Sequence, residues 1–386
     1  MRTIVAISVG LAGLSCASIQ ACSSNSSPQG FVNNPDGGSG SSSGSSGSGS
    51  GSSSGGGSGG SSGSSSGSFG DDGGNVGDDG GDGGPIVTNT IYAHTDDTLY
   101  SVDPQTKAVT MVGPFAGTSD SSTDSTVTDL AVDSNDEVYV NTESVVYKAA
   151  LPASNPGTVS LTKVATIQGT AKFYALAFAP QGALDANSEV LVGGDSNGAL
   201  WSINTTSGVT ASLGTFGANG TGATFVLSGD IVFYNDASNT ATGLATIRSC
   251  PTGKTNTITN CGNDFLASVN MTALKTAYTS GTAAPSLLGG IYGATTSGGM
   301  TTGPGNGTGF GDVFGLGAWN STVFGFTRSI TTPAAAAQLI TIDTTSGVGT
   351  SVQSFTFTKP DTGWSGAGVT TKVTISVPKP PPPPAQ

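Results

Sequence analysis

Three stretches of this chain repeat one another without a gap, and they constrain its fold more than any other feature. They are TLYSVDPQTKAVT from Thr98, ALWSINTTSGVTA from Ala199 and QLITIDTTSGVGT from Gln338. Each is typical of an outgoing strand, a corner at Asp or Asn, and a returning strand. Asp and Asn suit such a corner because their side chains can accept a hydrogen bond from the backbone two residues on. Gly208 and Gly347 can adopt the positive φ of a tight hairpin, whereas Lys107 in the first copy predicts a longer turn.

Fainter copies begin near Val145 and Leu244, so the repeats start near residues 99, 145, 200, 244 and 339. The last interval is about twice the others, which indicates one further unit inside it. A period of about 40–50 residues with four short strands per unit is typical of a β-propeller. We therefore predict an all-β fold, a β-propeller of five to seven four-stranded blades. Paired β-sandwiches are the alternative, but they would explain the alternating strands without explaining the aligned hairpins.

The repeats resemble those of NHL, kelch-like and quinoprotein-like propellers, whose blades often carry a Leu-Tyr-x-Ile-Asp…Thr-Gly hairpin. This resemblance covers roughly residues 90–375 and implies a fold rather than an activity. The first copy lacks an innermost strand before Ile91, and the segment from Gly363 to Ile375 is expected to supply it and close the ring. A short helix is expected at residues 270–278. The Gly-rich segment 298–317 is expected to loop over one face.

The N-terminus has the three parts of a secretory signal, with Arg2, an apolar run from Ile4 to Leu14, and small residues after it. The apolar run is too short to span a bilayer. Ile19-Gln20-Ala21-Cys22 resembles a bacterial lipobox, which predicts a signal peptide at 1–21 and acylation of Cys22. Cys16 is a weaker rival, and an ordinary cleaved signal with an incidental Cys is the alternative. Two or three acyl chains would anchor the protein stably.

The chain thus resembles an exported lipoprotein of a Gram-negative, myxobacterium-like bacterium. The predicted partner is the lipid bilayer, and the predicted location is the outer membrane or the cell surface, anchored by lipid. After the lipidated segment 22–36, residues 37–85 are Gly, Ser and Asp with few apolar side chains, so they are expected to form a disordered tether. The Asp-rich end of this tether lacks the spacing of a calcium loop. The propeller is expected at 86–377, with a polyproline tail at 378–386.

The charge balance argues against a nucleic-acid partner. The chain has 25 acidic and 12 basic residues. Setting aside Arg2 and the six acids of residues 22–85 leaves 19 acids against 11 bases for the folded part and tail. Nucleic-acid affinity comes largely from Lys and Arg on phosphates. We expect a monomer that requires no cofactor.

Few residues suggest chemistry. Cys250 and Cys261 are an even pair in an exported protein, which predicts a disulfide. A metal site is disfavoured because the chain has a single histidine, His94. His94 lies near Asp96 and Asp97, but no nucleophile-elbow motif accompanies them, so no catalytic residue is assigned. Trp201 is expected in the core, whereas Trp319 and Trp364 are less determined. Several acids stand at strand edges, where turn residues also belong: Asp129, Asp133, Asp230 and Asp236.

Three functions are compatible with these features of the sequence. The leading hypothesis is a tethered, non-enzymatic binding module for a polysaccharide, a peptide or another envelope protein. The second is a hydrolase or lyase acting on polysaccharide at the channel face, which would need buried, pKa-shifted Asp residues beside a basic group. The third is a passive coat or spacer protein, which would have no concave site with converging polar groups.

Overall fold

The computed structural model describes residues 90–118, 124–220, 222–262, 264–292, 313–328, 336–357 and 363–375. The predicted signal peptide, Cys22, the tether and the polyproline tail lie outside these residues. Strands make up nearly all of the regular secondary structure in the described part of the chain, as the period of the repeats predicted.

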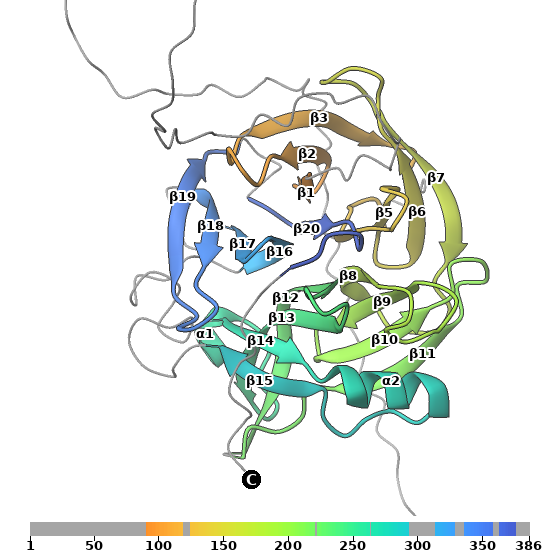
Figure 1. The fold of residues 1–386 in the computed structure, drawn as a ribbon, viewed down its shortest axis with the longest axis vertical. Helices are drawn as coiled ribbons and strands as arrows, with labels where there is room; N and C mark the ends of the chain where they lie inside the picture. The colour runs from red at the N-terminus through yellow and green to blue at the C-terminus, as the bar shows by residue number, and fades with distance from the viewer. Residues whose placement is uncertain are drawn as a thin grey trace, which may run out of the picture. The chain divides into compact units, whose positions relative to one another are not determined.

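Five four-stranded antiparallel sheets form the blades of a propeller in the described part of the chain (Figure 1). From the innermost strand outward, blade 1 contains β20 (Gly366–Val369), β1 (Ile91–His94), β2 (Thr98–Val102) and β3 (Val109–Ala116). Blade 2 contains β4 (Asp129–Val132), β5 (Val138–Asn141), β6 (Val145–Ala150) and β7 (Val159–Thr166). Blade 3 contains β8 (Phe173–Ala179), β9 (Val190–Asp195), β10 (Ala199–Ile203) and β11 (Thr210–Thr215).

Blade 4 contains β12 (Ala223–Asn235), β13 (Ala241–Pro251), β14 (Phe265–Val269) and β15 (Leu288–Tyr292). Blade 5 contains β16 (Val313–Trp319), β17 (Thr322–Thr327), β18 (Ala337–Ile342) and β19 (Gly349–Phe355). Two short helices, α1 (Ile258–Cys261) and α2 (Met271–Ser280), belong to blade 4. The outer strands of blades 1 and 2 also pair in parallel, with Phe115 opposite Val159.

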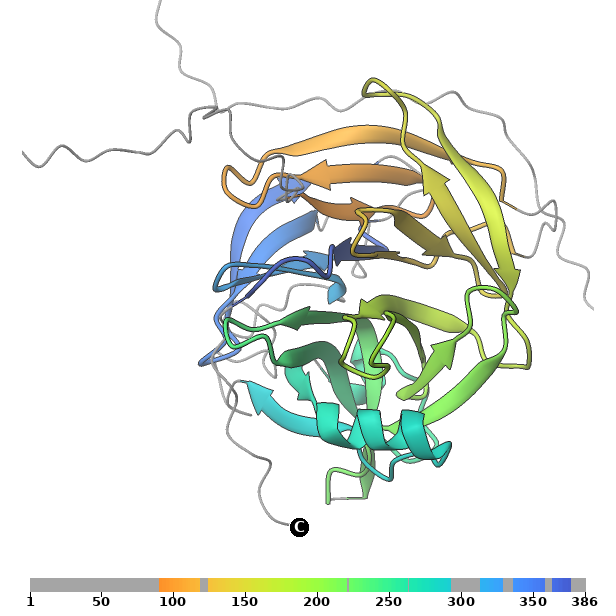
Figure 2. The ribbon, with the colours of Figure 1, turned by 45° about the vertical axis from the view of Figure 1, so that its right-hand side comes forward.

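The innermost strands contact one another in a closed cycle, β20 to β4, β8, β12, β16 and back to β20. Figure 2 shows the blades around this centre from a second direction. A closed cycle of five blades is a β-propeller and excludes the paired sandwiches. The predicted closure is confirmed, because β20 pairs with β1 and places Val369 opposite Ile91.

The three aligned hairpins join the third and fourth strands of blades 1, 3 and 5. Gly208 and Gly347 both have φ of 72°, and Lys107 adopts the same left-handed region with φ of 63°. Each donates its backbone N–H to the carbonyl of the corner residue, at 2.7–2.8 Å. The longer turn predicted at Lys107 is therefore wrong, because the lysine backbone adopts the conformation that glycine has in the other copies.

Blade 4 explains the long interval in the repeats. Leu244, read from the sequence as the start of a repeated hairpin, lies in β13, which is the second strand of its blade rather than the third. The described residues between Leu244 and Leu339 complete blade 4 and begin blade 5, and they contain no additional blade. The extra residues belong to the long β12–β13 pair, the loop with α1, and α2. The predicted helix is confirmed as α2, since Asn270 caps its N-terminus by accepting a bond from the Ala273 N–H.

The core lies between neighbouring blades and is made of apolar side chains from their facing strands. Part of the predicted Gly-rich loop belongs to this core, because residues 313–317 form β16; residues 298–312 lie outside the described residues. A Cβ on Gly315 would lie 2.8 Å from the Ala367 Cβ, and one on Gly317 would lie 2.9 Å from Ile91. These glycines let β16 approach blade 1 closely rather than form a loop.

Candidate functional site

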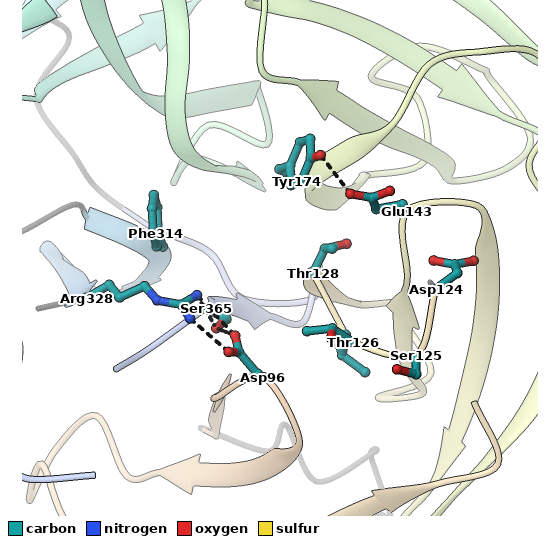
Figure 3. A pocket seen from close by; sticks show the side chains of 11 residues that line it. Asp96, Asp124, Ser125, Thr126, Thr128, Glu143, Tyr174, Phe314, Arg328 and Ser365 are labelled. Carbon is teal, nitrogen blue, oxygen red and sulfur yellow. Dashed lines mark hydrogen bonds and ion pairs between the residues drawn. The ribbon is translucent and has the colours of Figure 1, made fainter. Parts of the chain in front are cut away.

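A cavity of about 350 Å³ opens at the end of the ring where the innermost strands begin. We call it the mouth cavity. Its lining comes from blades 1, 2, 3 and 5 (Figure 3): Asp96, Asp124, Ser125, Thr126, Val127, Thr128, Glu143, Tyr174, Phe314, Arg328 and Ser365. Small-ligand sites in proteins have volumes of about 300–1,000 Å³ and combine apolar walls with a few placed polar groups. The mouth cavity has both properties, so polar groups from distant parts of the sequence converge at one concave site.

One side of the mouth cavity is a charged cluster that joins blades 1 and 5. The Arg328 guanidinium donates to both carboxylate oxygens of Asp96, at 3.0 and 2.8 Å. Ser365 lies between them, donating to Asp96 at 2.5 Å and accepting from Arg328 at 3.2 Å. The two ionic side chains are only a quarter exposed. A two-point Arg–carboxylate pair of this kind is geometrically rigid.

The opposite side is organised around Glu143, in the loop between β5 and β6. Its carboxylate accepts from the Tyr174 hydroxyl at 3.0 Å and forms an ion pair with Lys172. Burial and the neighbouring carboxylate of Glu143 raise the pKa of Tyr174, so its hydroxyl remains a donor. The Tyr174 side chain is 38% exposed, whereas the rest of β8 is buried. Its ring is therefore held in one place with apolar surface open to the cavity.

Below the mouth cavity, two carboxyl groups meet on the axis of the ring. Asp129 is the first residue of β4, next to the lining residue Thr128, and Asp230 lies in β12 of blade 4. Both are completely buried and hydrogen-bonded to each other. Burial raises the pKa of both carboxyls well above the ordinary value, and the charge of Asp230 raises that of Asp129 further. The pair therefore favours a state in which one of the two carboxyls carries a proton.

The remaining oxygens of this pair bind backbone N–H groups of neighbouring blades. Asp129 accepts from Leu176 of blade 3 at 2.5 Å, and Asp230 accepts from Leu316 of blade 5 at 2.7 Å. Asp230 also accepts from the N–H of Ala367 in β20. Asp129 belongs to blade 2 and Asp230 to blade 4, and their hydrogen bonds reach blades 1, 3 and 5. The pair thus connects all five blades. This arrangement is structural, because every blade is tied to the same buried pair.

His94, the last residue of β1, completes the buried centre. Its Nδ1 donates to the Thr95 carbonyl at 2.6 Å, and its Nε2 faces the Asp129 carboxyl at 3.9 Å. Burial lowers its pKa from 6.5 to about 4, so the imidazole is neutral near pH 7. No serine hydroxyl bonds to His94 among the described contacts, and no nucleophile is therefore paired with it.

Buried Asp residues beside a basic group were the feature expected of the hydrolase or lyase hypothesis, and the ring contains them. Their arrangement differs from that of a glycoside hydrolase. Glycoside hydrolases need two carboxyls about 5–5.5 Å or 6.5–9.5 Å apart, with the sugar between them. Asp129 and Asp230 are in hydrogen-bond contact and completely buried. A substrate would have to break the bonds that join the blades before it reached either carboxyl.

The other residues singled out in the sequence lie away from the mouth cavity. Cys250 and Cys261 form a disulfide in the structure, with their Cα atoms 4.3 Å apart. Asp133 and Asp236 accept bonds from backbone N–H groups two and four residues on, as turn residues do. Trp201, expected in the core, is partly buried and packs against core residues such as Phe173, while its indole N–H donates to the buried Asp195 at 3.1 Å. Trp364 is completely buried instead.

The sequence did not single out Tyr174, Glu143, Phe314 or Arg328 as site residues. One signal was available for Tyr174, because it is an aromatic residue at the start of a strand whose other members are apolar. Arg328 gave no signal, since its partner Asp96 comes from the opposite end of the domain. Within the described ranges, no three His, Cys, Asp or Glu side chains are grouped so as to hold a metal ion. No helix of the described part is long and apolar enough to cross a membrane.

No protein-family model and no curated protein sequence matches the chain. Among solved structures, it is similar to a protein of unknown function from Bacteroides caccae, at 10% identity and a TM-score of 0.36, covering 72% of this chain and 97% of that one. A protein of unknown function from Bacteroides thetaiotaomicron matches at 14% identity and a TM-score of 0.35, over 71% of this chain and 58% of that one. A protein from Lactobacillus plantarum matches at 12% identity and a TM-score of 0.31, over 72% and 98%. Because these TM-scores are below 0.5, function has to be inferred from the residues of this chain.

Proposed function

We propose that this protein is an exported, lipid-anchored β-propeller that binds a ligand in the mouth cavity without changing it chemically. The observation that carries the proposal is the mouth cavity itself, where polar and aromatic side chains from four blades converge. A passive spacer has no need of such a site. The location rests on the signal and the lipobox-like Ile19-Gln20-Ala21-Cys22, with residues 37–85 as a tether.

Binding rather than catalysis is favoured by how the polar groups are used. Asp96 is engaged by Arg328, and Glu143 is engaged by Lys172 and Tyr174. The carboxyls with raised pKa, Asp129 and Asp230, are completely buried. General acid–base catalysis needs a titratable group within hydrogen-bond reach of the substrate. The groups that face the mouth cavity instead form fixed walls.

The binding site can be tested by filling the cavity. Thr126 is exposed and lines the mouth cavity, whereas Thr162 is exposed on β7, away from it. Thermal shift of the full chain would be measured against methyl glycosides, neutral peptides and lysine-containing peptides. At least one probe should raise the melting temperature of the wild type and of Thr162→Trp but not of Thr126→Trp, and chromatography should recover it unchanged. A probe that stabilises Thr126→Trp equally, or that is cleaved, would contradict the proposal.

The anchor has a separate test. A fatty-acid analogue fed to the producing cells should label the wild type and the Cys16→Ala variant, and labelling should be lost in Cys22→Ala. Equal labelling of the wild type and Cys22→Ala would exclude Cys22 as the anchor, and loss in Cys16→Ala would move the site to Cys16.

A further inference from the structure

The charges of the mouth cavity constrain its ligand. Among the lining residues that the structure describes, the cation is Arg328, and Asp96 binds its guanidinium at two points. A phosphate or carboxylate ligand would have to compete with that two-point contact. Such contacts are among the stronger hydrogen bonds of proteins. Anionic ligands are therefore disfavoured.

A cationic ligand meets the same difficulty on the other side. Glu143 accepts from Tyr174 through one oxygen and pairs with Lys172 through the other. Asp124, at the outer edge, accepts a bond from the Ser144 hydroxyl. An ammonium group that bound Glu143 would have to displace Lys172. Asp96 and Glu143 are thus already paired with cations, and Asp124 accepts a hydroxyl hydrogen bond, so an uncharged ligand displaces none of these contacts.

The uncharged surface of the cavity has two kinds of groups. Tyr174 and Phe314 contribute aromatic rings from blades 3 and 5 (Figure 3). The hydroxyl groups of Ser125 and Thr126 also line the cavity, whereas that of Thr128 already donates to the Phe173 carbonyl at 2.9 Å and accepts from the Asn141 amide at 2.8 Å. A serine or threonine hydroxyl can donate one hydrogen bond and accept others. The cavity therefore combines aromatic rings with hydrogen-bonding groups.

A sugar ring has complementary surfaces, because its C–H face is apolar while its edge carries hydroxyl groups. The volume of about 350 Å³ is at the lower end of small-ligand sites. We propose that the mouth cavity binds the uncharged end of a saccharide chain, stacked on Tyr174 and hydrogen-bonded by Ser125 and Thr126. This inference rests on the proposed function and names its ligand class.

The main test substitutes Tyr174. It is exposed, so Tyr174→Ala should fold with the wild-type melting temperature. Tyr174→Phe keeps the ring and loses only the bond to Glu143. Val209→Ala is the matched control, because Val209 is a 50% exposed apolar side chain in the β10–β11 turn. Phe314→Ala tests the second ring.

Calorimetric titration of the full chain would use a panel of uncharged methyl glycosides and oligosaccharides, with a lysine-containing peptide and inorganic phosphate as the competing classes. At least one glycoside should bind saturably. Tyr174→Ala and Phe314→Ala should weaken that binding by about tenfold or more, the loss expected for an aromatic at the centre of a contact. Tyr174→Phe and Val209→Ala should stay close to the wild type.

Three results would overturn the inference. In the first, no glycoside binds, but the peptide or phosphate binds the wild type and not Thr126→Trp. The proposed ligand class would then be wrong, while the proposed binding function would stand. If a glycoside binds Tyr174→Ala as tightly as the wild type, the saccharide is bound elsewhere. If no probe of any class binds, both the ligand class and the proposed function fail.

Discussion

At the scale of single residues, the centre of the ring depends on one shared proton. Asp129 and Asp230 meet on the axis, and burial together with their mutual repulsion favours the state in which one carboxyl is neutral. The charged side chains of the mouth cavity above this pair, Asp96 and Arg328, already neutralise each other. Arg248 and Asp264 of blade 4 form a second buried ion pair at 2.5 Å.

These groups give the stability of the fold a defined pH dependence. The aspartates have pKa values above 3.8 in the fold, so their contribution is complete below that pH and is lost as pH rises through the folded pKa. His94 acts oppositely. Its pKa falls from 6.5 to about 4, so the unfolded chain binds more protons between these values and stability is lost as pH falls through them.

The first prediction separates the two effects. Asp129→Asn keeps a carbonyl oxygen for the Leu176 N–H and an amide donor for Asp230, but it removes the shared proton. As pH rises above the ordinary carboxyl pKa of 3.8, the axial pair should lower the wild-type unfolding free energy, and this loss should be reduced in Asp129→Asn. As pH rises from 4 to 6.5, the unfolding free energy of the variant should increase more steeply than that of the wild type. In the wild type, the increase due to His94 is opposed by the decrease due to the aspartate pair, and the variant lacks most of that decrease. Chemical denaturation across pH measures both.

The control is Asp185→Asn, because Asp185 is an exposed turn residue that accepts bonds from Asn187 and Ser188. It should retain the wild-type dependence of the unfolding free energy on pH above about pH 4. An identical dependence in the wild type and Asp129→Asn would show that the axial pair does not contribute to it.

Gly366 carries the second prediction. A Cβ at this position would lie 2.0 Å from the Asp129 Oδ1 and 2.5 Å from the His94 Nε2. Those atoms belong to buried side chains that have no room to move, so Gly366→Ala should lower the free energy of unfolding by about 1–3 kcal/mol or more. Gly182→Ala is the control, because nothing lies within 4 Å of its added Cβ and its φ is 86°. Its cost should be about 1 kcal/mol from backbone strain alone. Equal losses in the two variants would argue against close packing at the axis.

At the scale of elements, blade 4 departs most from the repeat. Its first two strands extend beyond the blade, pairing Ala223 with Pro251, and the Cys250–Cys261 disulfide joins the end of β13 to α1. Cys250 and Cys261 form a small buried cluster with Val226 of β12. A cross-link of this loop length restricts the unfolded chain and contributes about 3 kcal/mol in the chain-entropy model.

The third prediction follows from that cross-link. Replacing both Cys250 and Cys261 by Ser should lower the free energy of unfolding by about 3 kcal/mol. A thiol reductant should destabilise the wild type to a similar extent and leave the double variant unaffected. Calorimetry of both proteins with and without reductant measures this. A wild type whose melting temperature is unchanged by substitution and by reductant would show that the disulfide does not form in solution.

At the scale of the whole molecule, the ring is closed by its own C-terminal segment. β20 supplies the innermost strand of blade 1, and Ser365 and Ala367 contribute to the charged cluster and to the axial pair. Beyond β20, Thr370 donates to the Asp133 carbonyl and Lys372 pairs with Asp136. The same short segment therefore contacts both ends of the central channel and links blade 1 to blades 2, 4 and 5.

The fourth prediction compares two truncations. Ending the chain before Gly363 removes β20, exposes the edge of β1 and opens the cycle of innermost strands, and exposed edges promote aggregation. We expect low soluble yield or a much lower melting temperature. Removing only 378–386 should leave the melting temperature unchanged, because a polyproline segment donates no ladder bonds. A protein truncated before Gly363 that melts like the full chain would disprove the closure as a source of stability.

The sequence by itself determined the blades and their closure, because these depend on local chemistry. A corner Asp followed by residues able to adopt a positive φ makes a hairpin wherever it occurs, as the copies from Thr98, Ala199 and Gln338 show. The missing strand before Ile91 and the surplus apolar segment after Gly363 could likewise be matched by counting strands.

Only the tertiary structure decided the blade number and the site. The insertions in blade 4 lengthen the interval between repeats without adding a blade, and no local pattern distinguishes these two cases. The sequence placed Asp129 and Asp230 at strand edges with other acids, and Asp96 and Arg328 gave no sign of being partners. Whether the members of each pair come into contact depends on the number of blades that close the ring. It also depends on how closely the strands approach one another at glycines such as Gly366. Contacts of this kind join residues from opposite ends of the chain, so they follow from closure of the ring and not from the residues on either side of them.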